Sequence, residues 1–362
     1  MSTPLFPTQE IGSLQKPSLE ALGEWEGRLH FLSRLGPVAE EVLRHPDVAT
    51  LQNLRAAFAI AFLESAGLDR VYDGEARRVE MYEYAVRQMT GVEFQGHVRS
   101  WDSKYYRKGT VVNPVDLVAP YHLEEYDFVR DHARAAVKLP ITGPYTLADW
   151  SYNEYYLARQ PGWKGRAQRR AAQRELVVDL AKKVLRPTLR SLIEHGCRVI
   201  QIDEPAAGTH PDEAPLVVEG FNEATRGLDA EFSMHICYSR YQDLLPALLE
   251  AKACRQWAWE FANRDSDGHD GYEALKVLRD YSDTRSIGLG VVDVHRDALE
   301  TPEVVAERIG RAARYLGDPS KIWVNPDCGL RTRSLNVAYA KLQAMVHGAR
   351  LARTEVGGRS TA

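Results

Sequence analysis

The sequence lacks the features that mark several large classes of protein. Its four cysteines in 362 residues are too few for the disulfide framework of a small secreted domain. Its longest uninterrupted apolar run, Ala56–Leu63, is far shorter than the roughly 20 residues that cross a membrane. Its net charge of −4 gives no general attraction to nucleic acid or to a membrane surface. We therefore expect neither a nucleic-acid partner nor a membrane partner.

A targeting signal is also missing from the sequence. The stretch Met1–Phe6 has neither the basic start nor the long apolar core of a signal peptide. Cysteines outside a disulfide framework stay available as metal ligands in a reducing compartment. These two observations predict a cytoplasmic protein whose cysteines are free to bind a metal.

Strand patterns alternate with helical patterns, most regularly after Cys197. The predicted strands are Phe6–Ser13, Leu68–Asp73, Ala136–Ile141, Arg198–Ile202, Glu231–Ile236, Gln256–Phe261, Ser286–Val292 and Lys321–Val324. Helices such as Gln242–Ala251 and Pro302–Leu316 are expected between them. This alternation specifies a parallel sheet, and the length of the chain suits one large barrel. We predict an α/β fold, a (β/α)8 TIM barrel with helical and hairpin insertions in its first half.

We expect this barrel to form a single catalytic domain over residues 1–362, with a polar tail that frays from Thr354 to Ala362. The hairpin would come from Gly91–Arg99 and Tyr105–Val112. A doubly wound open sheet is the alternative architecture. It is disfavoured because no glycine-rich phosphate-binding loop follows the first predicted strand.

The most informative short segment is Ser233–Cys237, in which His235 and Cys237 lie two residues apart. On a strand, such residues point to the same side of the sheet, so a nitrogen and a thiolate ligand lie side by side. This pair suits a borderline or soft ion such as Zn²⁺. Glu260, near the end of another predicted strand, and Cys328, which follows a third, would complete a set of four ligands.

Active-site groups of such barrels come from the C-terminal ends of strands, and polar residues gather at those ends here. They are Gly12, Ser13, Asp203, Glu204, His235, Cys237, Glu260, Asp293, His295, Asn325, Asp327 and Cys328. Taken singly, each has an ordinary explanation as a core histidine, a buried small thiol, a surface acid or a loop acid. Together these explanations require several coincidences at one end of one barrel. Cys197 and Cys254 lie at strand starts, and we interpret them as packing residues.

The predicted ligand set also indicates the kind of chemistry. Structural zinc sites usually contain cysteines paired a few residues apart, whereas these ligands are scattered over three strands. Two thiolates and one carboxylate bring three negative charges to a dication, which makes it a poor Lewis acid for activating water. Such an ion suits a substrate thiol, because coordination deprotonates the thiol and leaves the sulfur nucleophilic. The sequence therefore predicts attack by a zinc-bound thiolate on an electrophilic carbon.

Longer motifs carry a resemblance that covers nearly the whole chain. They are Phe6–Thr8, Ile11–Ser13, Gly74–Glu75, Glu83, Thr142–Pro144, Trp150–Ser151, Gln201–Pro205, His235–Ser239, Gly290–His295 and, most specific of all, Trp323–Arg333. In these motifs the chain resembles the C-terminal catalytic domain of cobalamin-independent methionine synthase, as a short, stand-alone member. The resemblance implies a zinc-dependent methyltransferase that methylates the thiolate of homocysteine to give methionine.

The resemblance also implies a role for each matching residue. The residues that match zinc ligands are His235, Cys237, Glu260 and Cys328. The residues that match the homocysteine site are Ile11, Gly12 and Ser13 for the carboxylate, and Glu83 and Asp203 for the ammonium group. His295, with Asp293 beside it, matches the proton donor to the leaving group of the methyl donor. Trp150 matches an aromatic residue that borders the donor pocket.

The prediction of the methyl donor comes from a difference between this sequence and the full-length members of the family. Full-length members carry a second, N-terminal barrel that helps bind the polyglutamate tail of methyl-folate, and this sequence has no room for one. The resemblance to short members therefore implies a methylcorrinoid donor, either methylcobalamin or a methylated corrinoid protein. The alternative is the same reaction with 5-methyltetrahydrofolate.

Two other functions compete with homocysteine methylation. The scaffold could transfer an alkyl group to another thiol such as coenzyme M, although Glu83 and Asp203 would repel its sulfonate. The chain could also be a non-catalytic zinc-binding module. A run of cations from Arg159 to Arg174 would suit an acidic partner or a phosphate, but a solvated helix face is the simpler interpretation.

Overall fold

The computed structural model describes residues 4–36, 47–99 and 105–359. Its chain divides into two units, each built from segments that are distant in sequence. The first unit comprises Met1–Arg77, Asp127–Lys138 and Gln256–Ala362, and the second comprises Arg78–Tyr126 and Leu139–Arg255. No helix in the described ranges is both long and apolar enough to cross a membrane. A single domain over residues 1–362 stays a prediction.

The first unit contains rows of parallel strands. β9 (Cys254–Trp259), β10 (Ser286–Val292) and β11 (Ile322–Pro326) pair in parallel in that order. β1 (Arg70–Val71) pairs in parallel with β4 (Ala136–Val137). The N-terminal segment connects the two rows, because Thr8 bridges to Val324 of β11 and Gln9 bridges to Arg70 of β1.

The predicted strand Phe6–Ser13 is thereby reduced to two bridging residues. Phe6 has a left-handed backbone, with φ at 53°, and Pro7 has no N–H to donate to a ladder. Residues beyond Gln9 leave the neighbouring strands and form the loop Ile11–Ser13. This segment therefore supplies a loop at the strand ends, with only a minimal strand beneath it.

Capping residues define the early helices of the first unit. The side chain of Ser18 accepts the N–H of Ala21 and begins α1 (Leu19–Leu29), and Asp47 does the same for α3 (Val48–Ala66). The ring of Trp25 in α1 packs against Phe58 and Phe62 of α3, with centroids 5.9 Å and 5.2 Å away. These helices are the helical insertion expected in the first half of the chain.

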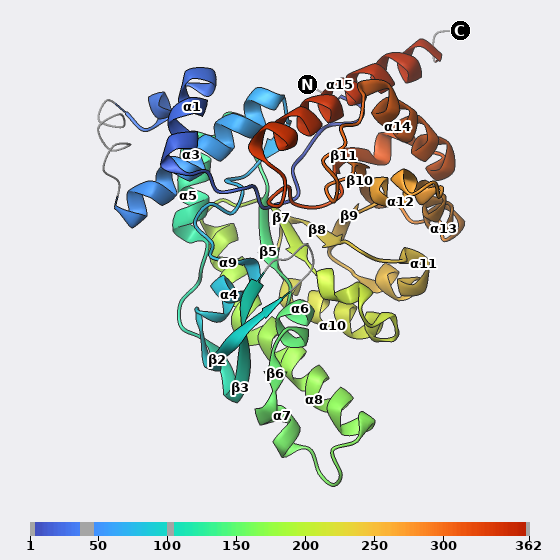
Figure 1. Ribbon diagram of the computed structural model, residues 1–362. Coiled ribbons are helices and arrows are strands. Elements are labelled where there is room, and N and C mark those ends of the chain that lie inside the picture. Colours follow the sequence, from blue (N-terminus) through green and yellow to red (C-terminus); the bar gives the residue numbers. More distant parts are fainter. Residues whose placement is uncertain (1–3, 37–46, 100–104, 360–362) are drawn as a thin grey trace. The chain divides into compact units, whose positions relative to one another are not determined.

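The later helices of the first unit follow its strands. They are α12 (Ala262–Ser266), α13 (Leu275–Asp280), α14 (Pro302–Leu316) and α15 (Leu335–Arg359), while α5 (Leu123–His132) ends in this unit. α14 and α15 lie side by side (Figure 1). Gly348 allows their close approach, because a Cβ at this position would lie only 2.4 Å from the side chain of Val305. The tail that was expected to fray from Thr354 is helical as far as Arg359.

The second unit contains three parallel strands and a hairpin. β5 (Leu139–Thr142), β7 (Val199–Asp203) and β8 (Glu231–Ile236) pair so that Thr142, Asp203 and His235 lie level at one edge. β2 (Met89–Arg99) and β3 (Tyr105–Leu117) form the predicted antiparallel hairpin, and β6 (Tyr152–Asn153) adds to β3 (Figure 1). The predicted strand Ala136–Ile141 is divided into β4 and β5.

The helices of the second unit are α4 (Met81–Val86), α6 (Pro144–Asp149), α7 (Glu154–Arg159), α8 (Arg166–Asp179), α9 (Arg186–Glu194), α10 (Ala214–Thr225) and α11 (Tyr241–Leu244). A π-helical segment, Leu180–Leu185, joins α8 to α9. The predicted helix Gln242–Ala251 is interrupted, because Pro246 cannot donate a backbone hydrogen bond. Short 3₁₀ turns span Phe31–Arg34, Pro205–Gly208, Pro211–Glu213, Ala247–Glu250, Gly271–Ala274 and Pro319–Lys321.

A buried carboxylate ties the end of β7 to the start of α6. Glu204 accepts the N–H groups of Tyr145 at 3.1 Å and Thr146 at 2.7 Å, and also the Thr146 hydroxyl at 2.7 Å. Burial raises the pKa of Glu204 to about 7, whereas the bonds from Thr146 and Tyr145 act to lower it. Gly143 makes room for this carboxylate, because a Cβ there would lie 2.2 Å from Glu204 Oε1.

A second buried ionic group lies within the second unit, before α4 and at the start of α5. Arg78 donates from Nε at 3.1 Å and from Nη2 at 2.5 Å to Glu125 Oε1, and His122 Nδ1 lies 3.3 Å from Glu125 Oε2. The ring of His122 stacks on Tyr84 with centroids 4.9 Å apart. Burial and the nearby Arg78 guanidinium lower the pKa of His122 to about 4.

We predict that His122 makes the protein more stable as pH rises from about 4 to about 6.5. In this range the imidazole takes up a proton in the unfolded chain but stays neutral in the folded protein. The depressed pKa corresponds to about 3 kcal/mol of unfolding free energy at most, which is lost as the pH falls through the folded value. His122→Asn removes the titrating ring, and asparagine tolerates the left-handed backbone found there.

Urea unfolding at several pH values from 4.5 to 6.5 would measure this effect. The wild-type free energy of unfolding should rise more steeply with pH than that of His122→Asn. The exposed His195 provides a control, since His195→Asn should keep the wild-type slope. Equal slopes in the wild type and His122→Asn would contradict the prediction.

Candidate functional site

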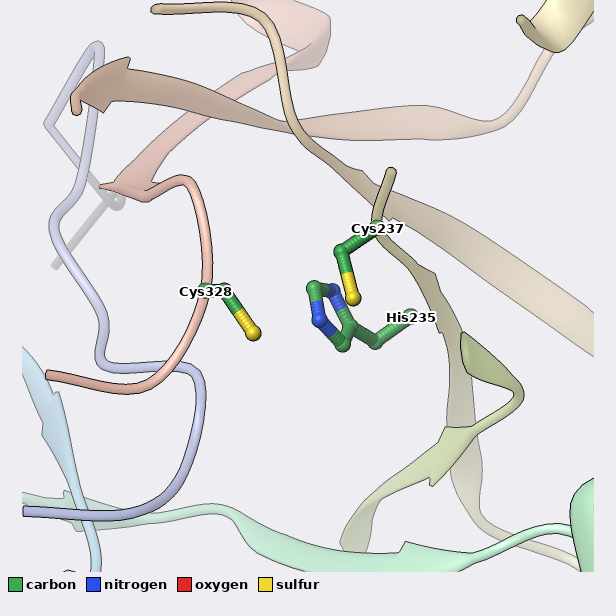
Figure 2. A group of neighbouring side chains, drawn as sticks. All are labelled: His235, Cys237 and Cys328. Atoms are coloured by element: carbon green, nitrogen blue, oxygen red, sulfur yellow. The ribbon is translucent and has the colours of Figure 1, made fainter. Parts of the chain in front are cut away.

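Three predicted metal ligands lie together. The ligand atoms of His235, Cys237 and Cys328 all lie within 4.8 Å of one another, and their side chains point toward a common centre (Figure 2). His235 is the next-to-last residue of β8, Cys237 follows the strand directly, and Cys328 follows β11. His235 and Cys237 are each only 3% exposed. Strand periodicity places the first two side by side, as the sequence predicts.

The chemistry of this group fits a soft or borderline dication. Two ligands roughly 2.0–2.3 Å from a tetrahedral Zn²⁺ ion lie roughly 3.3–3.8 Å apart. The three ligand atoms here, all within 4.8 Å of one another, are near enough to share one ion after small side-chain movements. The group offers one imidazole nitrogen and two sulfurs, which suit Zn²⁺ better than the oxygen-preferring Mg²⁺ or Ca²⁺. Among the described residues, this is the only group of three or more His, Cys, Asp or Glu side chains whose ligand atoms lie within 4.8 Å of one another.

Glu260, the fourth predicted ligand, is not part of this group. It directly follows β9 and is 2% exposed. Its Oε1 accepts a hydrogen bond from Asn263 Nδ2, and its Oε2 lies 3.4 Å from His295 Nε2. The carboxylate is therefore turned toward Asn263 and His295, and its role as a metal ligand stays a prediction.

The two predicted catalytic residues follow β10. The backbone N–H of His295 donates to Asp293 Oδ1 at 2.8 Å, and the backbone N–H of Asp293 donates to Glu300 Oε1 at 2.8 Å. Lys341, which is fully buried, donates to Glu300 Oε2 at 2.8 Å. These bonds fix the backbone of the loop and leave the His295 ring close to Glu260.

The loop Ile11–Ser13 lies against the carboxylate of Glu75, a residue for which the sequence predicts no role. A Cβ on Gly12 would lie 3.0 Å from Glu75 Oε1, and Leu14 N donates to the carbonyl of Gly74 at 3.0 Å. Glu75 is 8% exposed and has a left-handed backbone, with φ at 59°. A non-glycine residue in this conformation is strained, and such strain is concentrated at functional sites. Its position two residues after the predicted strand Leu68–Asp73 is the signal that could have identified it.

Glu83 and Asp203 have other contacts. The carboxylate of Glu83 accepts hydrogen bonds from the Arg87 guanidinium and, at 3.4 Å, from the backbone N–H of Arg107. Asp203 ends β7, pairs in register with His235 and accepts the Gln201 side chain at 2.7 Å. Asp203 therefore lies beside a predicted metal ligand, whereas Glu83 is engaged by arginine within its own unit.

Trp150 belongs to an aromatic cluster in the second unit. Its ring stacks on Tyr106 of β3 with centroids 5.0 Å apart, and Tyr82 of α4 contacts both rings. The Tyr82 hydroxyl accepts the N–H of Gly109 at 2.9 Å and lies 2.8 Å from Ser151 Oγ. The hairpin therefore holds the tryptophan against two tyrosines, so Tyr106 and Tyr82 join Trp150 as candidate lining residues.

The remaining sequence features have ordinary structural roles. Burial raises the pKa of Cys197 to about 12, so this thiol stays protonated and behaves as a packing residue. In the cation run, Arg166 and Arg170 pair with Asp212, and Arg174 pairs with Glu219. These pairings at the surface favour the simpler interpretation of a solvated helix face.

Comparisons with known proteins give the family. The model of the family described as "Cobalamin-independent synthase, Catalytic domain" matches residues 38–351. A methionine synthase from Pyrococcus abyssi is 37% identical over 98% of this chain and 95% of its own length. A methionine synthase from Saccharolobus solfataricus is 36% identical over 98% of this chain and 96% of its own length.

A solved structure extends the likeness to the fold. The B12-independent methionine synthase from Shewanella sp. W3-18-1, solved in complex with selenomethionine, superposes with a TM-score of 0.77 at 25% identity. The match covers 98% of this chain and 99% of that one. Because that protein belongs to a TIM-barrel family, the likeness and the parallel strands confirm the predicted α/β barrel class.

The comparisons also correct one expectation. A methylcorrinoid donor, free or carried by a corrinoid protein, is not supported, because the matching family is described as cobalamin-independent. The inference failed because it relied on the length of the chain, and length carries no information about the donor. With a family model that matches residues 38–351 and relatives up to 37% identical along nearly its whole length, this chain belongs to the cobalamin-independent synthase catalytic domain family and is an enzyme of the methionine synthase type.

Proposed function

We propose that this enzyme transfers a methyl group to the thiolate of homocysteine and so produces methionine. The observation that carries the proposal is the convergence of His235, Cys237 and Cys328, a group rich in thiolate. Zn²⁺ bound there would hold the substrate sulfur as a nucleophilic thiolate. Glu260, predicted as the fourth ligand, directly follows β9, and its carboxylate is engaged by Asn263 and lies close to His295.

The two ends of the amino acid would be held by groups at the strand ends. The backbone loop Ile11–Ser13 is suited to the carboxylate, and two acids are suited to the ammonium group. Asp203 is one of them, and Glu75 replaces Glu83 as the other because it lies against Gly12. The Shewanella relative, solved with selenomethionine, supports an amino-acid site in this family.

His295 would supply the proton that the leaving group of the methyl donor takes up. Its Nε2 lies 3.4 Å from Glu260 Oε2, so this carboxylate can orient the ring. Asp293 holds the backbone of the same loop through the His295 N–H. The predicted role of Asp293 is therefore to position the proton donor.

The methyl donor that fits best is 5-methyltetrahydrofolate. The relatives belong to a cobalamin-independent family, and the cluster of Trp150, Tyr106 and Tyr82 offers aromatic faces to a flat heterocycle. Glu75 and Asp203 disfavour coenzyme M as the thiol, since they would repel its sulfonate. A non-catalytic zinc module would have no use for His295 or for these two acids. A cytoplasmic location stays a prediction.

Replacing a metal ligand should remove zinc while the fold is retained. We expect Cys328→Ser and His235→Ala to bind only a small fraction of an equivalent of zinc and to lose activity, because each change removes a ligand. The fold should be retained, because the residues lie at the C-terminal ends of strands, which carry the catalytic groups of such barrels and contribute less to stability. Metal analysis by mass spectrometry and circular dichroism would measure both properties. The matched control is Cys197→Ser, which should keep its zinc. A full equivalent of zinc in Cys328→Ser would remove it from the ligand set.

The two candidate acids can be separated by identical substitutions. Glu75→Gln should weaken homocysteine binding about 10- to 100-fold, the usual loss for a charged hydrogen bond, while zinc content stays at the wild-type level. Glu83→Gln should change the affinity little, because its partners are Arg87 and Arg107. Calorimetric titration of homocysteine into the zinc-loaded proteins would measure both affinities. The opposite ranking would restore Glu83 to the site.

A paired assay tests the methyl donor. Purified zinc-loaded enzyme and homocysteine would be given 5-methyltetrahydrofolate or methylcobalamin in separate reactions, with methionine as the readout. We expect methionine from the folate, and Trp150→Ala should raise the KM for that donor about tenfold or more through lost stacking. Methionine formed from methylcobalamin alone would refute the folate proposal.

A further inference from the structure

A single carboxylate at the end of β11 organises the loop after β9. Asp327 is fully buried and accepts three backbone N–H groups. Its Oδ1 accepts those of Phe261 and Ala262, each at 2.9 Å, and its Oδ2 accepts that of Asn263 at 2.7 Å. Three donors converging on one buried carboxylate fix the loop far more tightly than a single neutral bond would.

The strand between these two loops makes room for the carboxylate. β10 pairs with β9 on one side and with β11 on the other, and Gly290 lies level with Asn325. A Cβ on Gly290 would lie 2.1 Å from Asp327 Oδ1 and 2.9 Å from the carbonyl of Trp259. The Asp327 side chain therefore packs against the backbone of β10 at Gly290, where any larger residue would clash with its carboxylate.

Asp327 is adjacent to several groups of the proposed site. Cys328 is the next residue in the chain, and a Cβ on Gly329 would lie 2.6 Å from Ser13 Oγ. On the other side, Asn263 donates its N–H to Asp327 and its side-chain amide to Glu260 Oε1. Cys328 is thus joined to Asp327 by the chain itself, and Glu260 is joined to Asp327 by hydrogen bonds through Asn263.

We propose that Asp327 is a positioning residue that sets the zinc affinity of this enzyme by fixing the Cys328 loop to the Glu260 loop. Its carboxylate oxygens are occupied by three backbone N–H groups, so it acts through the backbone of its neighbours. The inference rests on the proposed function in one respect, because it takes Cys328 as a zinc ligand. Residues that orient metal ligands commonly change metal affinity when they are replaced.

Asp327→Asn is the direct test. The amide keeps one oxygen for the N–H groups of Phe261 and Ala262, but its NH₂ group then faces the N–H of Asn263, donor against donor. We expect zinc affinity to fall about 10- to 100-fold, measured by competition with a chromophoric chelator on the folded protein. Gly290→Ala provides a second variant, because its added methyl group displaces the carboxylate without removing it, and it should lower zinc affinity in the same direction.

The matched control is Asp283→Asn. The side chain of Asp283 is 5% exposed, and it accepts Trp257 Nε1 at 2.7 Å just before the start of β10. Its replacement should lower the melting temperature but leave zinc affinity unchanged, which separates positioning from general destabilisation. An equal loss of affinity in Asp283→Asn would overturn the positioning role.

The remaining outcomes separate this inference from the proposed function. Wild-type zinc affinity in both Asp327→Asn and Gly290→Ala would overturn the role of Asp327 and leave the proposed function standing. Absence of zinc binding by the wild-type enzyme would overturn the proposed function, and the inference about Asp327 with it. If Asp327→Asn does not fold, the result from Gly290→Ala decides.

Discussion

Buried carboxylates that accept backbone N–H groups hold the strand-end loops of this enzyme in place. Asp327 accepts those of Phe261, Ala262 and Asn263, and Glu204 accepts those of Tyr145 and Thr146. In both cases an acid that follows one strand binds the first turn of a helix that follows another strand. A buried polar group is costly unless it is satisfied in this way, so these hydrogen bonds favour one arrangement of each loop. The positions of the chemically active side chains depend on that arrangement.

In the proposed function, the charges of the site select the substrate. Two thiolates would favour a soft ion and a sulfur ligand, while Glu75 and Asp203 would favour a cationic amine. A molecule that carries both a thiol and an ammonium group satisfies both conditions at once. The cluster of Trp150 with two tyrosines adds a flat apolar surface, which suits a donor with a planar ring.

The sequence predicted best those parts of the structure that local patterns determine. The predicted bounds of β8, β10 and α14 agree with the structure, because alternation, β-branched runs and a Thr-Pro helix start are local signals. Phe6–Ser13 was predicted less well, since its apolar pattern does not show that Phe6 adopts a left-handed backbone.

The candidate site divides in the same way. The proximity of His235 and Cys237 follows from strand periodicity alone. The choice between Glu75 and Glu83 does not, because it depends on which acid the fold brings against Gly12, and both lie in plausible local contexts. The role of Asp327 could not be predicted either, since its three partners lie more than 60 positions away. Contacts of that length are set by tertiary structure.

The bridging role of the N-terminal segment has a consequence for synthesis on the ribosome. Thr8 and Gln9 stand between β1 and β11, and the Gln9 side chain reaches Asn325, 316 positions later in the chain. Gln9 therefore waits for a residue 316 positions later before these parallel strands can be joined, whereas β5, β7 and β8 are complete much earlier. Closing so long a loop is slow, and the unpaired edges of β1 and β11 are open to wrong partners until it closes. The first unit is thus the part of the nascent enzyme that most needs protection from aggregation.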